Sequence, residues 1–166
     1  MEFTGRPYKE DALYNAFDGD RTSQFTYDVK RVAVNKNVPL DRIWDYKAKI
    51  ERIEFRTTNS GRAYEYKFFY WDLAEKEWKE IIYVNENSLH YNVHNLENPV
   101  ITNKMRYICM RAGNDGEANW HNIYEIYYYG EVVPNLPVEE PENVRATVNQ
   151  AGYVLLEWEQ PEPNQD

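Results

Sequence analysis

The sequence predicts an all-β fold, built as an antiparallel sandwich or barrel. Aromatic residues, which favour strands, are unusually frequent, with 15 Tyr, 6 Phe and 5 Trp. Several short runs of strand character are separated by turn-forming residues, which is typical of such folds. No long segment shows a helical period, and no internal repeat is visible in the sequence.

The individual strands are predicted from these runs. In residues 63–72, alternate positions place four aromatic residues on one face: Tyr64, Tyr66, Phe68 and Tyr70. The turn-forming stretch TNSGR separates this run from a strand in 49–58, so we expect the two to form a hairpin. Further strands are expected in 76–84, 106–112 and 122–130, and residues 11–17 are compatible with one short helical turn.

Four segments are predicted along the chain. Residues 1–7 form a lead-in, 8–133 the main domain, 134–140 a linker rich in Pro and Glu, and 141–166 a separate C-terminal piece. Residues 134–166 contain seven acidic residues and one basic residue, against 21 acidic and 18 basic residues in 1–133. The main domain is therefore only mildly acidic.

The C-terminal piece resembles the opening of a fibronectin type III domain, in which one strand follows a Pro and a second ends in Leu-x-Trp before another Pro. The matching residues are Pro141, Val144, Ala146, Val148, Val154, Leu156, Trp158 and Pro161. Such a sandwich needs about 100 residues. We therefore expect the chain to be a fragment of a larger multidomain protein.

Composition excludes several classes of partner. The formal net charge of −9 argues against nucleic acid and against anionic membrane surfaces. No apolar run approaches the roughly 18 residues needed to span a bilayer, so no membrane insertion is expected. No hydrophobic leader is visible at the start of the sequence. Cys109 is the only cysteine, and its strand-like surroundings predict a buried structural thiol.

Residues 18–23 concentrate carboxylates and hydroxyls in six positions, with the sequence DGDRTS. They could form an ordinary Asx-type turn or a site that holds an ion. An EF-hand is excluded, because counting from Asp18 puts Ser23 where the loop needs Gly and Val29 where it needs Glu.

The same stretch, DGDRTSQF, together with the distant NIYEIYYYG, resembles the two ends of a discoidin-like (factor V/VIII type C) domain. Family 32 carbohydrate-binding modules share this domain. The motif residues present are Ala16, Asp18, Gly19, Ser23 and Phe25 at one end, and Glu125, Ile126 and Gly130 at the other. The resemblance covers residues 8–133 and implies a jelly-roll sandwich of the galactose-binding-domain type. It also implies a structural Ca²⁺ held by Asp18, Asp20, Ser23 and Glu125.

The resemblance further implies a sugar site in the loops at one end of the sandwich. Trp120 offers an apolar ring face for sugar C–H groups, and nearby polar side chains can bind hydroxyls. The candidate polar residues are His121, Asn114, Asn119 and Arg111, with Arg56, Asn59 and Arg62 from a second loop. The alternative is that Trp120 caps the core and the Asn residues serve turns.

No catalytic motif is visible, so we expect the fragment not to be an enzyme. Two functional classes remain open. One is a carbohydrate-binding module that binds a glycan as a monomer, within a larger protein such as a bacterial glycoside hydrolase. The other is a protein-interaction or spacer module of a cell-surface adhesin. In either setting the resemblance implies an extracellular, periplasmic or cell-surface location. The lone cysteine excludes the disulfide clamp of vertebrate-type members, which favours a bacterial type.

Overall fold

The computed structural model describes residues 2–3, 10–29, 37–134, 142–148 and 154–159. Two compact units are present, Met1–Val133 and Pro134–Asp166. The division between them falls where the segment rich in Pro and Glu begins. The predicted lead-in and most of the predicted linker lie outside the described residues.

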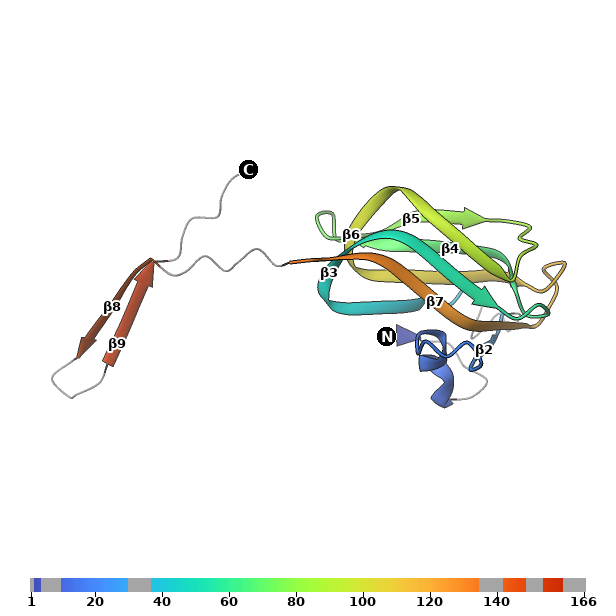
Figure 1. Ribbon diagram of the computed structural model, residues 1–166, viewed down its shortest axis with the longest axis horizontal. Helices are drawn as coiled ribbons and strands as arrows, with labels where there is room; N and C mark the ends of the chain where they lie inside the picture. Colours follow the sequence, from blue (N-terminus) through green and yellow to red (C-terminus); the bar gives the residue numbers. More distant parts are fainter. Residues whose placement is uncertain (1, 4–9, 30–36, 135–141, 149–153, 160–166) are drawn as a thin grey trace. The chain divides into compact units, whose positions relative to one another are not determined.

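The first unit consists almost entirely of strands (Figure 1). A short 3-10 helix, η1 (Glu10–Ala16), lies at the position where a helical turn was expected. The strands are β1 (Glu2–Phe3), β2 (Phe25–Asp28), β3 (Leu40–Thr57), β4 (Ala63–Asp72), β5 (Glu77–Val84), β6 (Tyr91–Ala112) and β7 (Trp120–Val133). Among the described residues, no helix is long and apolar enough to cross a membrane.

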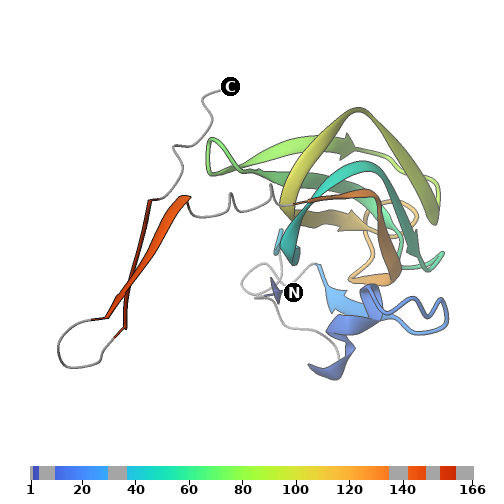
Figure 2. The ribbon, with the colours of Figure 1, turned by 60° about the vertical axis from the view of Figure 1, so that its left-hand side comes forward.

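Two long strands, β3 and β6, build the sandwich, because each takes part in both of its layers (Figures 1 and 2). Residues 52–56 of β3 pair with the beginning of β6 on one side and with β7 on the other. Together with β2 these segments form one layer, called layer A here. Residues 40–43 of β3 pair with residues 104–107 of β6, and the later part of β6 continues to β4 and β5 as layer B. Residues 48–50 of β3, between these two segments, pair with both β6 and β7. All of these pairings are antiparallel, so the predicted all-β sandwich is confirmed.

The expected hairpin between β3 and β4 is wrong. In the sheet order, β6 lies between the two strands. Their inward-facing rings meet across the core instead, with Phe55 of β3 and Tyr66 of β4 at a centroid distance of 4.9 Å. Segment 58–62 therefore crosses from layer A to layer B.

The core between the layers is aromatic. Its largest fully buried side chains include six rings: Phe25, Tyr27, Phe55, Tyr66, Phe68 and Tyr107. Edge-to-face and tilted contacts, such as Phe68 with Tyr107 at 5.0 Å, add about 0.5–1.5 kcal/mol each to the stabilisation from burial. Cys109 is also buried, as predicted, and burial raises the pKa of its thiol far above the usual range.

Gly130, the last residue of the closing sequence motif, has a steric role in β7. It pairs with Ile50, beside an irregularity in the β3 register. A Cβ at position 130 would collide with the backbone carbonyl of Lys49.

We therefore expect Gly130→Ala to lower the free energy of unfolding by about 1–3 kcal/mol, as overpacking does. Urea denaturation would measure this loss. Gly61 is the matched control, since a Cβ there meets side chains, those of Asn122 and Thr58, and no backbone atom. Equal losses in Gly61→Ala and Gly130→Ala would contradict this explanation.

In the described residues of the second unit, β8 (Glu142–Val148) and β9 (Val154–Glu159) form an antiparallel pair. Both strands lie within the segment that resembles a fibronectin type III opening. Pro141 and Pro161, which flank them in that resemblance, lie outside the described residues. The fibronectin type III assignment remains a prediction.

Candidate functional site

Residues 18–23 form a tight loop between η1 and β2. Gly19 has a φ of 80°, in the left-handed region that favours glycine. The Asp18 carboxylate accepts hydrogen bonds from the Asp20 N–H and the Ser23 hydroxyl, each at 2.8 Å. The Asp20 carboxylate accepts bonds from the N–H and hydroxyl of Thr22, at 2.8 and 2.6 Å. The hydrogen bonds of an Asx-type turn, one of the two alternatives for this stretch, are therefore present.

Glu125 on β7 is what distinguishes this place from an ordinary turn. The residue is only 1% exposed, and neither carboxylate oxygen has a hydrogen-bond partner. Asp18 and the Gly19 N–H lie beside it without meeting hydrogen-bond geometry. Burial raises the pKa of the Glu125 carboxyl to about 7, and the neighbouring Asp18 carboxylate adds to the rise. An unpaired buried carboxylate is costly unless a cation or a proton neutralises it.

A backbone irregularity in β7 gives Glu125 this orientation. Thr57 of β3 pairs with Ile123, and its neighbour Arg56 pairs with Glu125, so β7 contains one extra residue at this point. Both Ile123 and Ile126 can therefore face the core. Glu125 lies between them and is directed to the outer side of layer A, toward loop 18–23.

The group formed here suits a hard cation. The structure brings together Asp18, Ser23 and Glu125, three of the four predicted calcium ligands. The fourth, Asp20, is exposed and its carboxylate is directed at Thr22. Within the described ranges, no group of three or more His, Cys, Asp or Glu side chains is gathered tightly enough to hold a metal. Calcium accepts hydroxyl and carbonyl oxygens as well as carboxylates, and the orphaned Glu125 oxygens fit such an ion.

Three loops lie at the end of the sandwich that contains the predicted sugar site: 58–62, 85–90 and 113–119. We call this the loop end. The Gly113 N–H donates to the Arg62 carbonyl, and the Arg62 guanidinium donates to the Asn114 carbonyl at 3.3 Å. The Thr57 N–H donates to the His90 carbonyl. Backbone bonds thus join loops that are distant in sequence.

Several predicted sugar-binding residues are exposed at this end. Trp120, the first residue of β7, is 40% exposed. Asn59, Asn114 and Asn119 are exposed as well, and Arg62 is half-buried. A ring and several amides are therefore present at the same end of the sandwich, which is the combination that a sugar requires.

Two of the predicted arginines have other surroundings. Arg111 stacks on Tyr64 at 4.9 Å and donates to the Asp115 carbonyl at 3.3 Å, so it shapes loop 113–119. Arg56 lies on the outer side of β3, where its guanidinium stacks on the Tyr91 ring at 5.0 Å. The contacts in the structure do not bring Arg56 to Trp120.

His121 does not face a ligand, and the prediction that it does is wrong. It is fully buried, next to the exposed Trp120, because successive strand residues point to opposite faces. Its Nδ1 lies 2.8 Å from the Gly61 carbonyl and its Nε2 lies 2.8 Å from the Tyr107 hydroxyl. Nδ1–H therefore donates to Gly61, and Nε2 accepts from Tyr107. Both ring nitrogens are used to connect β7 to loop 58–62 and to β6.

No protein-family model matches the sequence, and no curated protein sequence matches it either. Solved structures do resemble it. The family 32 carbohydrate-binding module of Streptococcus pneumoniae EndoD is 17% identical, with a TM-score of 0.64 over 79% of this chain and 94% of the module. The module CBM32-3 of a Clostridium perfringens family 31 glycoside hydrolase is 20% identical, with a TM-score of 0.63 over 79% and 89%.

A third similar structure is CpGH89CBM32-5 from Clostridium perfringens, in complex with GalNAc-β-1,3-galactose. It is 9% identical, with a TM-score of 0.62 over 78% of this chain and 93% of the module. These similarities show that the first unit has the galactose-binding-like jelly-roll fold of family 32 carbohydrate-binding modules. The fold that the two sequence motifs implied is therefore confirmed.

Proposed function

We propose that the first unit is a non-catalytic carbohydrate-binding module of a larger protein. The observation that supports this most directly is that its sandwich has the fold of modules solved from glycoside hydrolases. The exposed Trp120 at the loop end agrees with the proposal, because aromatic rings stack on the C–H faces of sugars. Asn59, Asn114 and Asn119 supply the directional donors and acceptors that hydroxyls need.

Such a module increases the local concentration of a weakly bound glycan near a catalytic domain elsewhere in the protein. We propose a secreted bacterial glycoside hydrolase as the parent, with a fibronectin type III domain following the module and the module acting as a monomer. The similar C. perfringens module was solved with GalNAc-β-1,3-galactose, so this disaccharide and galactose are the first ligands to test.

We also propose that the module contains one structural Ca²⁺, held by Asp18 and Glu125 with Ser23, and with Asp20 if its carboxylate turns away from Thr22. The ion would neutralise the buried Glu125 carboxylate and connect the beginning of the sandwich to its last strand. Nothing at this place positions a substrate or a reacting water, so the proposed role is stability.

Replacement of Trp120 tests the sugar site. We expect Trp120→Ala to weaken binding of the recognised sugar about tenfold, since one stacked ring contributes on the order of 1 kcal/mol or more. Titration calorimetry would follow a screen of the wild-type protein on a glycan array.

Tyr46 is a matched control, because it is also 40% exposed but lies on β3 close to the end of β7 that is opposite Trp120. Tyr46→Ala should leave affinity unchanged. If Trp120→Ala unfolds the protein, the ring serves the core. If no glycan binds the wild-type protein at millimolar concentration, the module is a spacer or a protein-interaction domain.

A further inference from the structure

Asn122 of β7 is hydrogen-bonded to loop 58–62 through both its backbone and its side chain. Its N–H donates to the Gly61 carbonyl at 3.0 Å, and its carbonyl accepts the Thr58 N–H at 3.2 Å. The side-chain amide of Asn122 also donates to the Thr58 hydroxyl oxygen at 3.1 Å. These bonds join the loop to the first residues of β7.

The Thr58 hydroxyl oxygen also shapes the loop itself. It accepts the Gly61 N–H at 2.9 Å, which turns the chain back between these two residues. Gly61 is buried against the Asn122 amide, because a Cβ at position 61 would collide with that side chain. We call Thr58, Gly61 and Asn122 the loop lock. Thr58 and Asn122 are half-buried, so the protein covers much of the lock.

The lock fixes a part of the chain that the sheet does not. The pairing of β3 with β7 ends at Thr57 and Ile123, and β3 itself ends at Thr57. From Thr58 onward the position of the loop relative to β7 therefore depends on the lock, together with the bond from His121 to the Gly61 carbonyl.

The two chain segments that the lock joins carry candidate sugar-binding residues. Trp120, 40% exposed, lies two residues before Asn122 and therefore on the same face of β7. Asn59, which is exposed, directly follows Thr58, and Arg62 lies in the same loop. The position of the Asn59 amide relative to the Trp120 ring is thus set through the lock.

We propose that Thr58 and Asn122 are positioning residues of the sugar site. They hold Asn59 in place relative to Trp120 before a sugar binds. This inference rests on the proposed function of the loop end. Ordering a flexible loop during binding reduces affinity, and a loop that is already held in place avoids this loss. The lock therefore strengthens binding although its own side chains do not contact the sugar.

Sugar affinity in variants of the lock tests the proposal. Thr58→Val removes the hydroxyl and keeps the volume, so it should weaken binding about three- to tenfold, the scale of ordering one side chain. Thr58→Ser keeps the hydroxyl and should retain the wild-type affinity. Asn122→Ala breaks the same bond from the other side and should give the same loss as Thr58→Val. The probe for titration calorimetry is GalNAc-β-1,3-galactose, or the glycan that the wild-type protein binds most tightly on an array.

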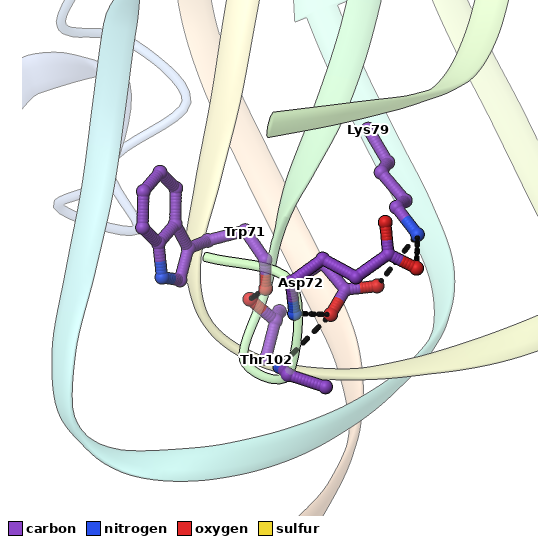
Figure 3. Close-up of polar contacts among 6 residues, drawn as sticks. Trp71, Asp72, Lys79 and Thr102 are labelled. Atoms are coloured by element: carbon purple, nitrogen blue, oxygen red, sulfur yellow. Dashed lines mark hydrogen bonds and ion pairs between the residues drawn. The ribbon is translucent and has the colours of Figure 1, made fainter. Parts of the chain in front are cut away.

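Thr102→Val is the matched control for loss of a hydrogen-bonded hydroxyl. The Thr102 hydroxyl donates to the Trp71 carbonyl at 2.8 Å, in a polar cluster that also contains Asp72 and Lys79 (Figure 3). This cluster lies at the end of β4 that is far from loop 58–62. Thr102 is fully buried, so Thr102→Val should lower the free energy of unfolding at least as much as Thr58→Val does, yet leave sugar affinity unchanged.

A double variant shows whether the lock acts through Asn59. Thr58→Val should weaken binding less in an Asn59→Ala background than in the wild-type background, because the effects of coupled residues do not add. Equal losses in both backgrounds would show that Thr58 acts on something other than Asn59, which would overturn the positioning role.

Two further results would overturn the proposal. Wild-type affinity in both Thr58→Val and Asn122→Ala would show that the lock does not contribute to binding. An equal loss of affinity in Thr102→Val would attribute the effect to global stability. Absence of glycan binding by the wild-type protein is a different result, since it overturns the proposed function of the loop end and this inference with it.

Discussion

Addition of Ca²⁺ to the metal-free protein should raise its melting temperature by about 5–10 °C. The physical reason is the Glu125 carboxylate, which is buried without a hydrogen-bond partner beside Asp18. An ion at 100 times its dissociation constant stabilises the folded state by about 2.7 kcal/mol. For a domain of this size each kcal/mol corresponds to roughly 2–4 °C. Differential scanning fluorimetry with and without a chelator measures the shift.

Two variants make this prediction specific. Asp18→Asn should abolish the response to Ca²⁺, whereas Asp45→Asn, an exposed carboxylate of β3, should retain it. Glu125→Gln should also abolish the response, yet it should melt above the metal-free wild-type protein, because a neutral amide costs less to bury than a carboxylate. A wild-type melting curve that is the same in Ca²⁺ and in chelator would contradict the calcium site.

The sequence predicts best the strands in which apolar and polar residues alternate consistently. The run 63–72 coincides with β4, Ala63–Asp72. For β6, only residues 106–112 were recognised, because its earlier part places polar residues on the inside. Asn92 and Thr102 are buried there and hydrogen-bonded, which interrupts the apolar pattern. A strand that bends between two layers also changes which of its faces is inward. The local sequence pattern does not predict where that change occurs.

The candidate site was predictable in its residue types but not in its geometry. The two sequence motifs brought Asp18 and Glu125 together correctly, although they are far apart in the chain. The direction of Glu125 depends on the extra residue in β7, and such an irregularity is set by pairing with β3. The sequence does indicate that only one of Trp120 and His121 can face the core, since adjacent strand residues point to opposite faces. Only the pairing of β7 with β2 shows which of the two is inside.

His121→Phe should lower the free energy of unfolding by about 3 kcal/mol at neutral pH. The ring volume is retained, but the Tyr107 hydroxyl loses its acceptor, and an unsatisfied buried group costs about 1–3 kcal/mol. The Gly61 carbonyl loses the bond from His121, worth about 1 kcal/mol, and keeps only the bond from the Asn122 N–H. His90→Phe is the control, because His90 is exposed and should change stability little. Urea denaturation measures both variants, and equal stability of His121→Phe and wild type would contradict the buried network.

We also expect the stability difference between the wild-type protein and His121→Phe to depend on pH. Burial lowers the pKa of His121 from 6.5 to about 4. Between these values the unfolded chain binds a proton at this position and the folded chain does not, so the contribution of His121 to stability is complete above pH 6.5 and decreases as pH falls toward 4. The loss amounts to about 3 kcal/mol. Glu125, with its raised pKa, acts in the opposite sense when no metal is bound, so the useful quantity is the difference between wild type and His121→Phe. The difference in free energy of unfolding between wild type and His121→Phe should decrease by this amount as the pH falls to 4. A difference that stays constant with pH would show that folding does not lower the pKa of His121.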